Sequence, residues 1–124
     1  MSQLKILLVD DEQEFVSALA ERLELRGYQV TAVNSGEAAL QTFESEVPDI
    51  VVLDLKMPGL SGLDVLKQIN SRFEYIPVLL LTGYGSTKDG MKGMHYGAYD
   101  YLMKPLNIDD LIAKIHEAVQ AVNS

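Results

Sequence analysis

Five polar residues of this 124-residue chain stand at the ends of short apolar runs. They are three carboxylates, one hydroxyl and one ammonium: Asp10, Asp11, Asp54, Thr82 and Lys104. If those runs are neighbouring parallel strands, the carboxylates converge and repel one another unless a cation joins them. Mg²⁺ suits a site with few protein oxygen ligands and remaining waters. The pattern therefore predicts a magnesium site.

Asp54 is the candidate nucleophile of this group. No His or Cys stands near these strand ends, so Ser–His and Cys–His catalysis would lack a base. A carboxylate needs no deprotonation, and carboxylates form aspartyl-phosphate intermediates. Phosphoryl transfer needs mainly positioning and charge neutralisation, which Mg²⁺, Lys104 and the Thr82 hydroxyl would supply. Thr82 as an ordinary strand residue and Lys104 as a surface charge are the alternatives, but Pro105 fixes a turn that directs Lys104.

The elements that would position these residues alternate along the chain. Short, nearly continuous apolar runs predict strands at 4–9, 28–33, 50–54, 77–82 and 99–103. Amphipathic segments predict helices at 13–26, 34–45, around Leu63–Ile69, at 86–97, and after Asn107. Asn34 (with Glu37) and Asn107 are the predicted N-terminal caps. The helix at 86–97 is weak, because Gly90 and Gly93 each cost about 1 kcal/mol against Ala.

This alternation predicts a doubly wound α/β fold. Five strands and five helices imply a five-stranded parallel sheet with helices on both faces and the flavodoxin-like strand order 2-1-3-4-5. In such folds the ligand crevice lies at the carboxyl ends of the strands, where the five polar residues stand. No repeat or linker interrupts the pattern, so residues 1–124 are expected to form one domain.

Composition narrows the classes of partner. Ten basic against eighteen acidic residues give a net charge of -8, and this field disfavours direct binding of nucleic acid. The absence of cysteine excludes disulfides and thiol catalysis. No apolar stretch reaches transmembrane length and no signal peptide is evident at the N-terminus. We therefore expect a cytoplasmic protein without membrane contact.

Four segments in order carry a resemblance to a known family. They read LVDDE at 8–12, DLKMPGLSG at 54–62, LTG at 81–83 and DYLMKP at 100–105. Together with the fivefold strand–helix pattern, they resemble the receiver domain of bacterial two-component response regulators over essentially the whole chain. The resemblance implies a phosphorelay switch rather than an enzyme, with only self-phosphorylation from a donor and self-dephosphorylation.

The resemblance also implies a role for each metal-site residue. Asp54 would accept a phosphoryl group from a histidine kinase or a histidine phosphotransfer protein. Asp11, Asp54 and the backbone carbonyl of Lys56 would ligate Mg²⁺ directly, with Mn²⁺ as a substitute. Asp10 would act largely through water.

Further implied roles concern the switch and its output. Thr82 and Lys104 would bind phosphoryl oxygens, Lys104–Pro105 would be a cis peptide, and Tyr101 would turn inward as Thr82 moves. The weak helix at 86–97 would be the easiest element to shift, so we expect the signal to leave through the face made by this helix, the strand at 99–103 and the last helix. The alternative is that Gly90 and Gly93 only permit close packing. A downstream protein or an output domain would receive the signal, and the chain would be a monomer or a weak dimer through the same face.

Lys56 and Tyr84 are expected to tune the lifetime of the phosphoryl group. Both should project over the mouth through which a hydrolytic water must enter. Tyr84 is bulky, and the Lys56 ammonium has no free lone pair with which to orient that water. The alternative is that both side chains point into solvent. We predict a comparatively long-lived phosphoryl state.

Two other functions remain as alternatives. A phosphatase of the haloacid-dehalogenase type would carry a second Asp where Lys56 stands, and Lys56 cannot protonate a leaving group in the same way. A flavodoxin-like FMN carrier would need a loop that cradles a phosphate after the first strand. Residues 10–12, Asp-Asp-Glu, would repel that phosphate.

Overall fold

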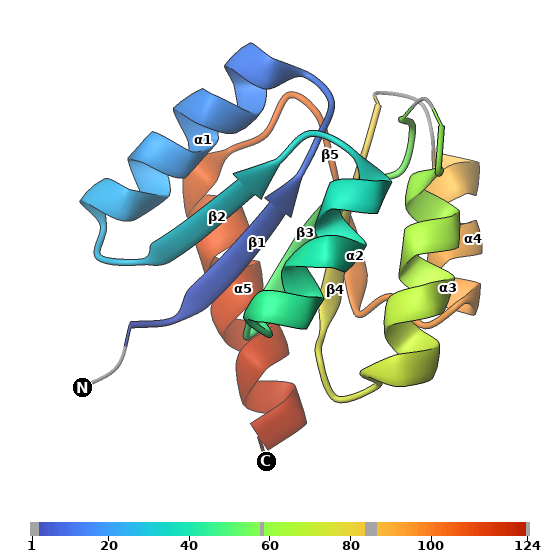
Figure 1. Cartoon of the computed structure of the whole chain (residues 1–124). Helices are drawn as coiled ribbons and strands as arrows, with labels where there is room; N and C mark the ends of the chain where they lie inside the picture. Colours follow the sequence, from blue (N-terminus) through green and yellow to red (C-terminus); the bar gives the residue numbers. More distant parts are fainter. Residues whose placement is uncertain (1–2, 58, 84–86, 124) are drawn as a thin grey trace.

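Five parallel strands form one sheet in the order β2-β1-β3-β4-β5 (Figure 1). The computed structural model describes residues 3–57, 59–83 and 87–123. The strands are β1 (Lys5–Val9), β2 (Gln29–Val33), β3 (Ile50–Asp54), β4 (Val78–Thr82) and β5 (Asp100–Met103). The helices are α1 (Gln13–Leu25), α2 (Gly36–Ser45), α3 (Gly62–Arg72), α4 (Thr87–His95) and α5 (Ile108–Asn123). The predicted fold class and strand order are confirmed.

Side chains alternate between the two faces of the sheet and build two cores. On one face, α1 and α5 pack over Leu8 and Leu79; on the other, α2 and α3 pack over Leu7 and Leu53. The second face also carries α4, whose Gly93 lies against Leu80 (Figure 1). Because β1, β3 and β4 are covered on both sides, their sequences are almost wholly apolar.

Helix starts depend on single capping side chains. Asn107 caps α5 as predicted, because its Oδ1 accepts from the backbone N–H of Asp110 at 3.0 Å. The predicted cap of α2 was wrong by one residue. Ser35 accepts from the N–H of Ala38 at 3.1 Å, while the Asn34 amide donates to Gln13 instead.

Gly62 brings α3 directly against the end of β3. A Cβ at this position would overlap the carbonyl oxygen of Asp54 and lie 2.6 Å from the Cα of Leu55. The preceding residue, Ser61, caps α3 through the N–H of Asp64 at 3.2 Å. A glycine is therefore required where the helix leaves the candidate site.

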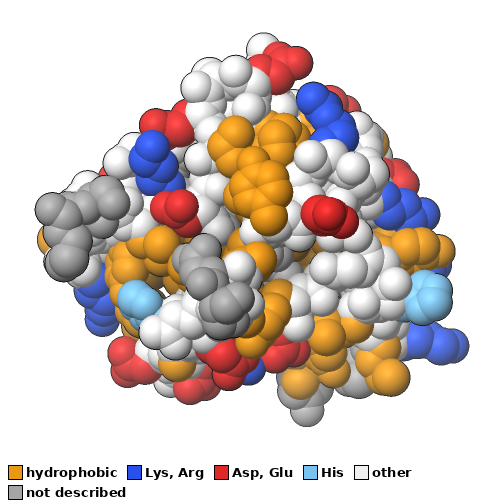
Figure 2. Space-filling model, turned by 90° about the horizontal axis from the view of Figure 1, so that it is seen from below, with side chains coloured by type: hydrophobic (Ala, Val, Ile, Leu, Met, Phe, Trp, Pro, Cys, Tyr) orange, Lys and Arg blue, Asp and Glu red, His pale blue; other side chains and the backbone are white. Residues whose placement is uncertain are grey.

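The opposite end of the molecule, at the amino ends of the strands, is of a different kind. Figure 2 looks at this end, where hydrophobic side chains lie between scattered charged ones. A shallow hollow of about 360 Å³ is lined there by apolar residues that include Ile76, Pro77, Ala98 and Val122. Among the described residues, no helix has both the length and the apolar character needed to cross a membrane.

Candidate functional site

Two buried carboxylates lie side by side at the carboxyl end of the sheet. Asp54 is the last residue of β3, and Asp10 follows β1, the neighbouring strand. Asp10 is 1% exposed and Asp54 is 6% exposed. The strand order thus brings together two residues that are distant in sequence, as the sequence predicts.

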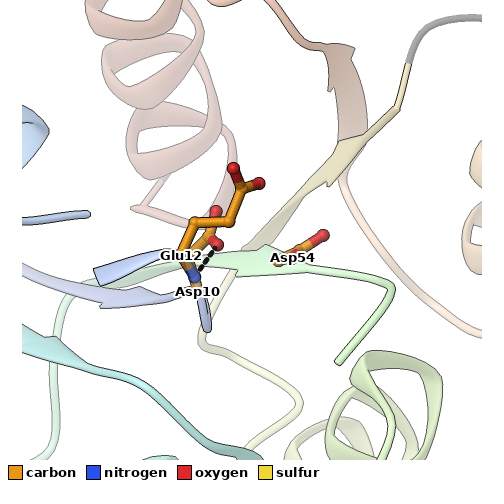
Figure 3. A group of neighbouring side chains, drawn as sticks. All are labelled: Asp10, Glu12 and Asp54. Carbon is orange, nitrogen blue, oxygen red and sulfur yellow. Dashed lines mark hydrogen bonds between the residues drawn. The ribbon is translucent and has the colours of Figure 1, made fainter. Parts of the chain in front are cut away.

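A third carboxylate joins them from the start of α1. Oxygen atoms of Asp10, Glu12 and Asp54 lie within 4.8 Å of one another (Figure 3). The backbone N–H of Glu12 donates to Asp10 Oδ1 at 2.9 Å, which fixes this turn. Glu12 was not predicted as a site residue: the sequence shows an acidic side chain after Asp10 and Asp11, but its contact with Lys104 depends on the turn after Asp10. Asp11 is exposed and lies outside this group, so its role as a ligand stays a prediction.

Lys104 follows β5, the edge strand of the sheet, and its side chain extends to this cluster. Its Nζ lies 2.7 Å from Glu12 Oε1, 2.8 Å from Asp10 Oδ2 and 3.9 Å from Asp54 Oδ2. The ammonium also lies 4.5 Å from the centre of the Phe15 ring. Burial lowers the pKa of Lys104, but the hydrogen bonds to Asp10 and Glu12, together with the negative charges of Asp54 and Asp10, raise that pKa overall. The ammonium therefore stays charged at neutral pH.

The backbone around Lys104 is ordered by β4. Its N–H donates to the carbonyl of Thr82 at 2.8 Å. The Lys104–Pro105 peptide is cis, as the resemblance implied.

Burial and charge set the ionisation of Asp54. Burial raises the pKa of its carboxyl, and the neighbouring charge of Asp10 raises it further. Lys104 and the N–H of Lys56 oppose this, Asp11 adds a smaller increase, and the resulting pKa is about 6. Asp54 is thus mostly anionic at neutral pH, although its surroundings favour the neutral form. A cation or another positive group would relieve this.

Thr82 ends β4 beside Asp54 with an unsatisfied hydroxyl. The residue is 2% exposed, and its Oγ1 has no hydrogen-bond partner among residues 3–57, 59–83 and 87–123. A buried hydroxyl without a partner costs about 1–3 kcal/mol. An anionic oxygen or a water arriving at this strand end would remove that cost.

Lys56 lies at the rim of the site. Its backbone N–H donates to Asp54 Oδ1 at 3.3 Å. Its exposed ammonium lies 3.4 Å from Asp89 Oδ2 on α4. The predicted partner in lifetime control, Tyr84, lies outside the described residues.

Tyr101 connects β5 to α4. It is half-buried, and a Cβ on Gly90 would lie 2.6 Å from its Cδ2 atom. The ring therefore rests directly on the bare backbone of α4. Gly90 permits a close contact, which was the alternative reading of the glycines in this helix.

The donor atoms of the cluster suit a hard cation. Asp10, Glu12 and Asp54 offer only carboxylate oxygens, and the chain has no cysteine. Oxygen ligands of this kind are preferred by Mg²⁺ and Mn²⁺. The expected cation therefore fits the residues present.

A sequence profile described as the response regulator receiver domain matches residues 6–116. The chain is 42% identical to the transcriptional regulatory protein CpxR of Escherichia coli K12 over 111 residues, which cover 90% of this chain and 47% of that protein. It is 40% identical to the sensory transduction protein RegX3 of Mycolicibacterium smegmatis over 115 residues, 93% of this chain and 50% of that protein. The chain spans about half the length of these curated relatives.

Solved structures agree with this match. A response regulator receiver domain protein from Clostridium thermocellum superposes with a TM-score of 0.89 at 34% identity, covering 95% of each chain. A CheY-like receiver domain protein from Methanospirillum hungatei superposes with a TM-score of 0.91 at 29% identity, covering 98% of each chain.

Proposed function

Because the chain belongs to the response regulator receiver domain family of two-component signalling, we propose that it is a switch operated by phosphorylation of Asp54. The phosphoryl donor would be a histidine kinase or a histidine phosphotransfer protein. The observation that carries this proposal is the buried Asp54 carboxylate, with Asp10 beside it and the Lys104 ammonium 3.9 Å away. Such a carboxylate is held where a phosphoryl group would meet positive charge.

The proposed transfer leaves every atom accounted for. A carboxylate oxygen of Asp54 attacks phosphorus, and the O–P bond forms as the P–N bond to the donor histidine breaks. The imidazole leaves with the electron pair and takes up a proton. With a pKa of about 6, Asp54 is mostly deprotonated at neutral pH and needs no base.

Asp10, Asp11, Asp54 and the backbone carbonyl of Lys56 would hold Mg²⁺ or Mn²⁺. When bound, the cation supplies neutralisation of the phosphoryl oxygens. Support comes from the oxygen-only donor set and from the raised pKa of Asp54, which a nearby cation would lower again.

Thr82 and Lys104 would bind the phosphoryl oxygens. The Thr82 hydroxyl is a buried donor without a partner in the described part of the chain, so a phosphoryl oxygen would satisfy it. Lys104 would supply a charge-assisted hydrogen bond. As Thr82 moves toward the phosphoryl group, Tyr101 would follow and change the α4–β5 surface.

The signal would leave through the face made by α4, β5 and α5. This face carries exposed, adaptable methionines, Met91, Met94 and Met103, which suit a protein contact. The recipient would be a downstream protein or an output domain, and the chain would be a monomer or a weak dimer through this face. Neither direct nucleic-acid binding nor membrane contact is proposed, and the expected compartment is the cytoplasm.

Mass spectrometry of the intact protein tests the acceptor. Incubation with Mg²⁺ and acetyl phosphate should add one phosphoryl group to the wild type and none to Asp54→Asn, which keeps the shape but loses the nucleophile. Asp109→Asn, an exposed carboxylate in the first turn of α5, is the matched control and should react like the wild type. A full adduct on Asp54→Asn would place the acceptor elsewhere.

A beryllofluoride mimic of the phosphoryl group tests the output face. We expect the largest amide shifts in residues 84–104, of which 84–86 lie outside the described residues, because α4 is short and contains Gly90 and Gly93. Equal shifts over the whole sheet, or shifts confined to α2, would count against this face.

A further inference from the structure

One ammonium is shared unequally among three carboxylates at the candidate site. Lys104 Nζ lies at hydrogen-bond distance from Glu12 (2.7 Å) and Asp10 (2.8 Å), but 3.9 Å from Asp54. Figure 3 draws the three carboxylates, whose oxygen atoms lie within 4.8 Å of one another. The resting ammonium is therefore bound by the two residues that are not the proposed phosphoryl acceptor.

Glu12 and Asp10 differ in how firmly they are held. The side chain of Asp10 is 2% exposed, whereas that of Glu12 is 63% exposed. Apart from the bond of its carboxylate to Lys104, Glu12 is held in the described part of the chain by its backbone, whose N–H donates to Asp10 Oδ1 and whose carbonyl accepts from the N–H of Val16. Its carboxylate can consequently turn to solvent at small cost, whereas Asp10 cannot leave.

Lys104 is constrained in the opposite way. Its side chain is 18% exposed, and its ammonium lies over the Phe15 ring. It can move toward Asp54 only by loosening its present bonds. Of these, the bond to Glu12 is the one that can open without leaving a buried charge unpaired.

We propose that Glu12 is the resting counter-ion of Lys104 and competes with the phosphorylated Asp54 for its ammonium. Glu12 is thus a positioning residue that opposes the phosphorylated state. This inference rests on the proposed function. A phosphoryl group on Asp54 adds negative charge on that side of Lys104, so the ammonium moves there and Glu12 swings outward. The strength of the Glu12–Lys104 pair then sets how readily the domain accepts and keeps the group.

The test combines Glu12→Gln with a cycle on Lys104. We expect Glu12→Gln to accept phosphoryl from acetyl phosphate with Mg²⁺ roughly three- to tenfold faster, and to bind beryllofluoride more tightly by a similar factor, as the loss of one partly exposed charged hydrogen bond implies. Glu12→Asp, whose shorter side chain should not reach Lys104, should behave like Glu12→Gln. Glu14→Gln, which removes an exposed charge from the first turn of α1, should match the wild type.

Two further measurements separate competition from other roles of Glu12. In a Lys104→Met background, Glu12→Gln should change neither the rate of phosphorylation nor the affinity for beryllofluoride. If the rate still rose as much as in the wild-type background, Glu12 would act only through its general charge, and the proposal would be overturned. Calorimetric titration with Mg²⁺ should give affinities within about threefold of the wild type. A loss of tenfold or more would identify Glu12 as a cation ligand and overturn the proposal.

The outcomes also distinguish this inference from the proposed function. If wild type and Glu12→Gln form the adduct at the same rate, only the competition is wrong. If the wild type forms no adduct, the proposed function fails and this inference fails with it.

Discussion

Every residue of β3 and β4 is buried, whereas every residue of β5 is half-buried or exposed. The buried strands carry Asp54 and Thr82. The more exposed strand carries Tyr101 and is followed by Lys104. The residue proposed to receive the phosphoryl group thus lies on a fully buried part of the sheet, and the two residues proposed to respond lie on a less buried part that is easier to displace.

The helix beside β5 extends this difference. α4 contains two glycines, and each meets a neighbour at a distance that leaves no room for a Cβ: Gly90 against Tyr101 and Gly93 against Leu80. Tyr101 belongs to the half-buried edge of the sheet, and Leu80 to its buried centre. α4 therefore packs against Tyr101, which lies on the half-buried edge of the sheet and can move, and against Leu80, which lies in the buried centre and cannot.

The largest expected effect compares two leucines of the same core. Leu79 in β4 is fully buried, and Leu102 in β5 is half-buried, and both pack in the cluster under α1 and α5. Leu79→Ala should lower the free energy of unfolding by about 3 kcal/mol, and Leu102→Ala by about 1 kcal/mol, because less apolar area and a smaller cavity are involved. Urea unfolding measures both. Equal losses would mean that the edge strand is as tightly held as the centre.

The next largest effect on the free energy of unfolding comes from Asp54, because its carboxyl lies in the buried part of the sheet. Its pKa is raised from 3.8 to about 6, so between these values the folded state holds a proton that the unfolded state releases. The free energy of unfolding then falls as pH rises through this range, by about 3 kcal/mol. Asn cannot ionise. Without metal, Asp54→Asn should therefore be more stable than the wild type at pH 7.5 by about this amount.

The pH dependence is the decisive part of that comparison. The advantage of Asp54→Asn should shrink as pH falls through this range and vanish below about pH 3, where Asp54 is protonated in both states. Asp109→Asn, which removes an exposed carboxylate, is the matched control. A constant difference between Asp54→Asn and the wild type at all pH values would show that burial does not oppose the charge.

Local patterns predicted most of this fold. The central strands can be predicted from the sequence because burial on both faces requires nearly continuous apolar runs, as in 50–53. Helix caps were less certain, since Asn34 and Ser35 are both good caps and propensity does not choose between them. Packing chooses: a Cβ on Gly36 would lie 2.8 Å from the carbonyl of Leu60, so the helix starts where this glycine meets the loop after β3.

The candidate site was also predictable only in part, because contacts between distant residues do not follow from local sequence patterns. Asp10, Asp54 and Lys104 could be placed together because strand ends meet at one edge of a parallel sheet. The place of Glu12 could not be predicted, because it depends on the turn after Asp10 and on how far Lys104 reaches from a distant strand. Long-range reach of this kind leaves no periodic trace in the sequence.

A smaller effect contrasts the two glycines of α4. Alanine is favoured in a helix by about 1 kcal/mol over glycine, but each new methyl group meets a neighbour. In Gly93→Ala the neighbour is Leu80, which is fully buried, so overpacking should lower the free energy of unfolding by about 1–2 kcal/mol. In Gly90→Ala the Tyr101 ring can move outward, so stability should stay within about 1 kcal/mol of the wild type.

Two readouts check this contrast. Urea unfolding gives the stabilities, and the ring resonances of Tyr101 should shift in Gly90→Ala and not in Gly93→Ala. If Gly90→Ala loses as much stability as Gly93→Ala, then Tyr101 is as rigidly packed as Leu80. The proposed difference between the buried strands β3 and β4 and the edge strand β5 would then be wrong.

The smallest expected effect concerns the lifetime of the phosphoryl group and Lys56, which links the loop after the buried strand β3 to α4. Its backbone belongs to the loop after β3, while its ammonium lies 3.4 Å from Asp89 on α4. Hydrolysis of a phosphoryl group on Asp54 needs a water in line with phosphorus, and an ammonium offers that water no acceptor. We expect Lys56→Asn, and likewise Tyr84→Glu, to shorten the lifetime roughly three- to tenfold, which is about 1 kcal/mol in the barrier. The double variant should decay fastest.

Asp89→Asn separates the acceptor argument from the ion pair. Both side chains of the pair are well exposed, at 72% for Lys56 and 42% for Asp89, and such a pair contributes about 0–1 kcal/mol. Removing Asp89 leaves the Lys56 ammonium unable to accept from water, so the lifetime should stay close to that of the wild type. Phosphoryl decay is followed by intact mass after the donor is removed. If wild type, Lys56→Asn, Tyr84→Glu and the double variant decay at one rate, neither side chain controls the approach of water. If Asp89→Asn shortens the lifetime as much as Lys56→Asn, the ion pair to α4 controls it, and the lone-pair argument is wrong.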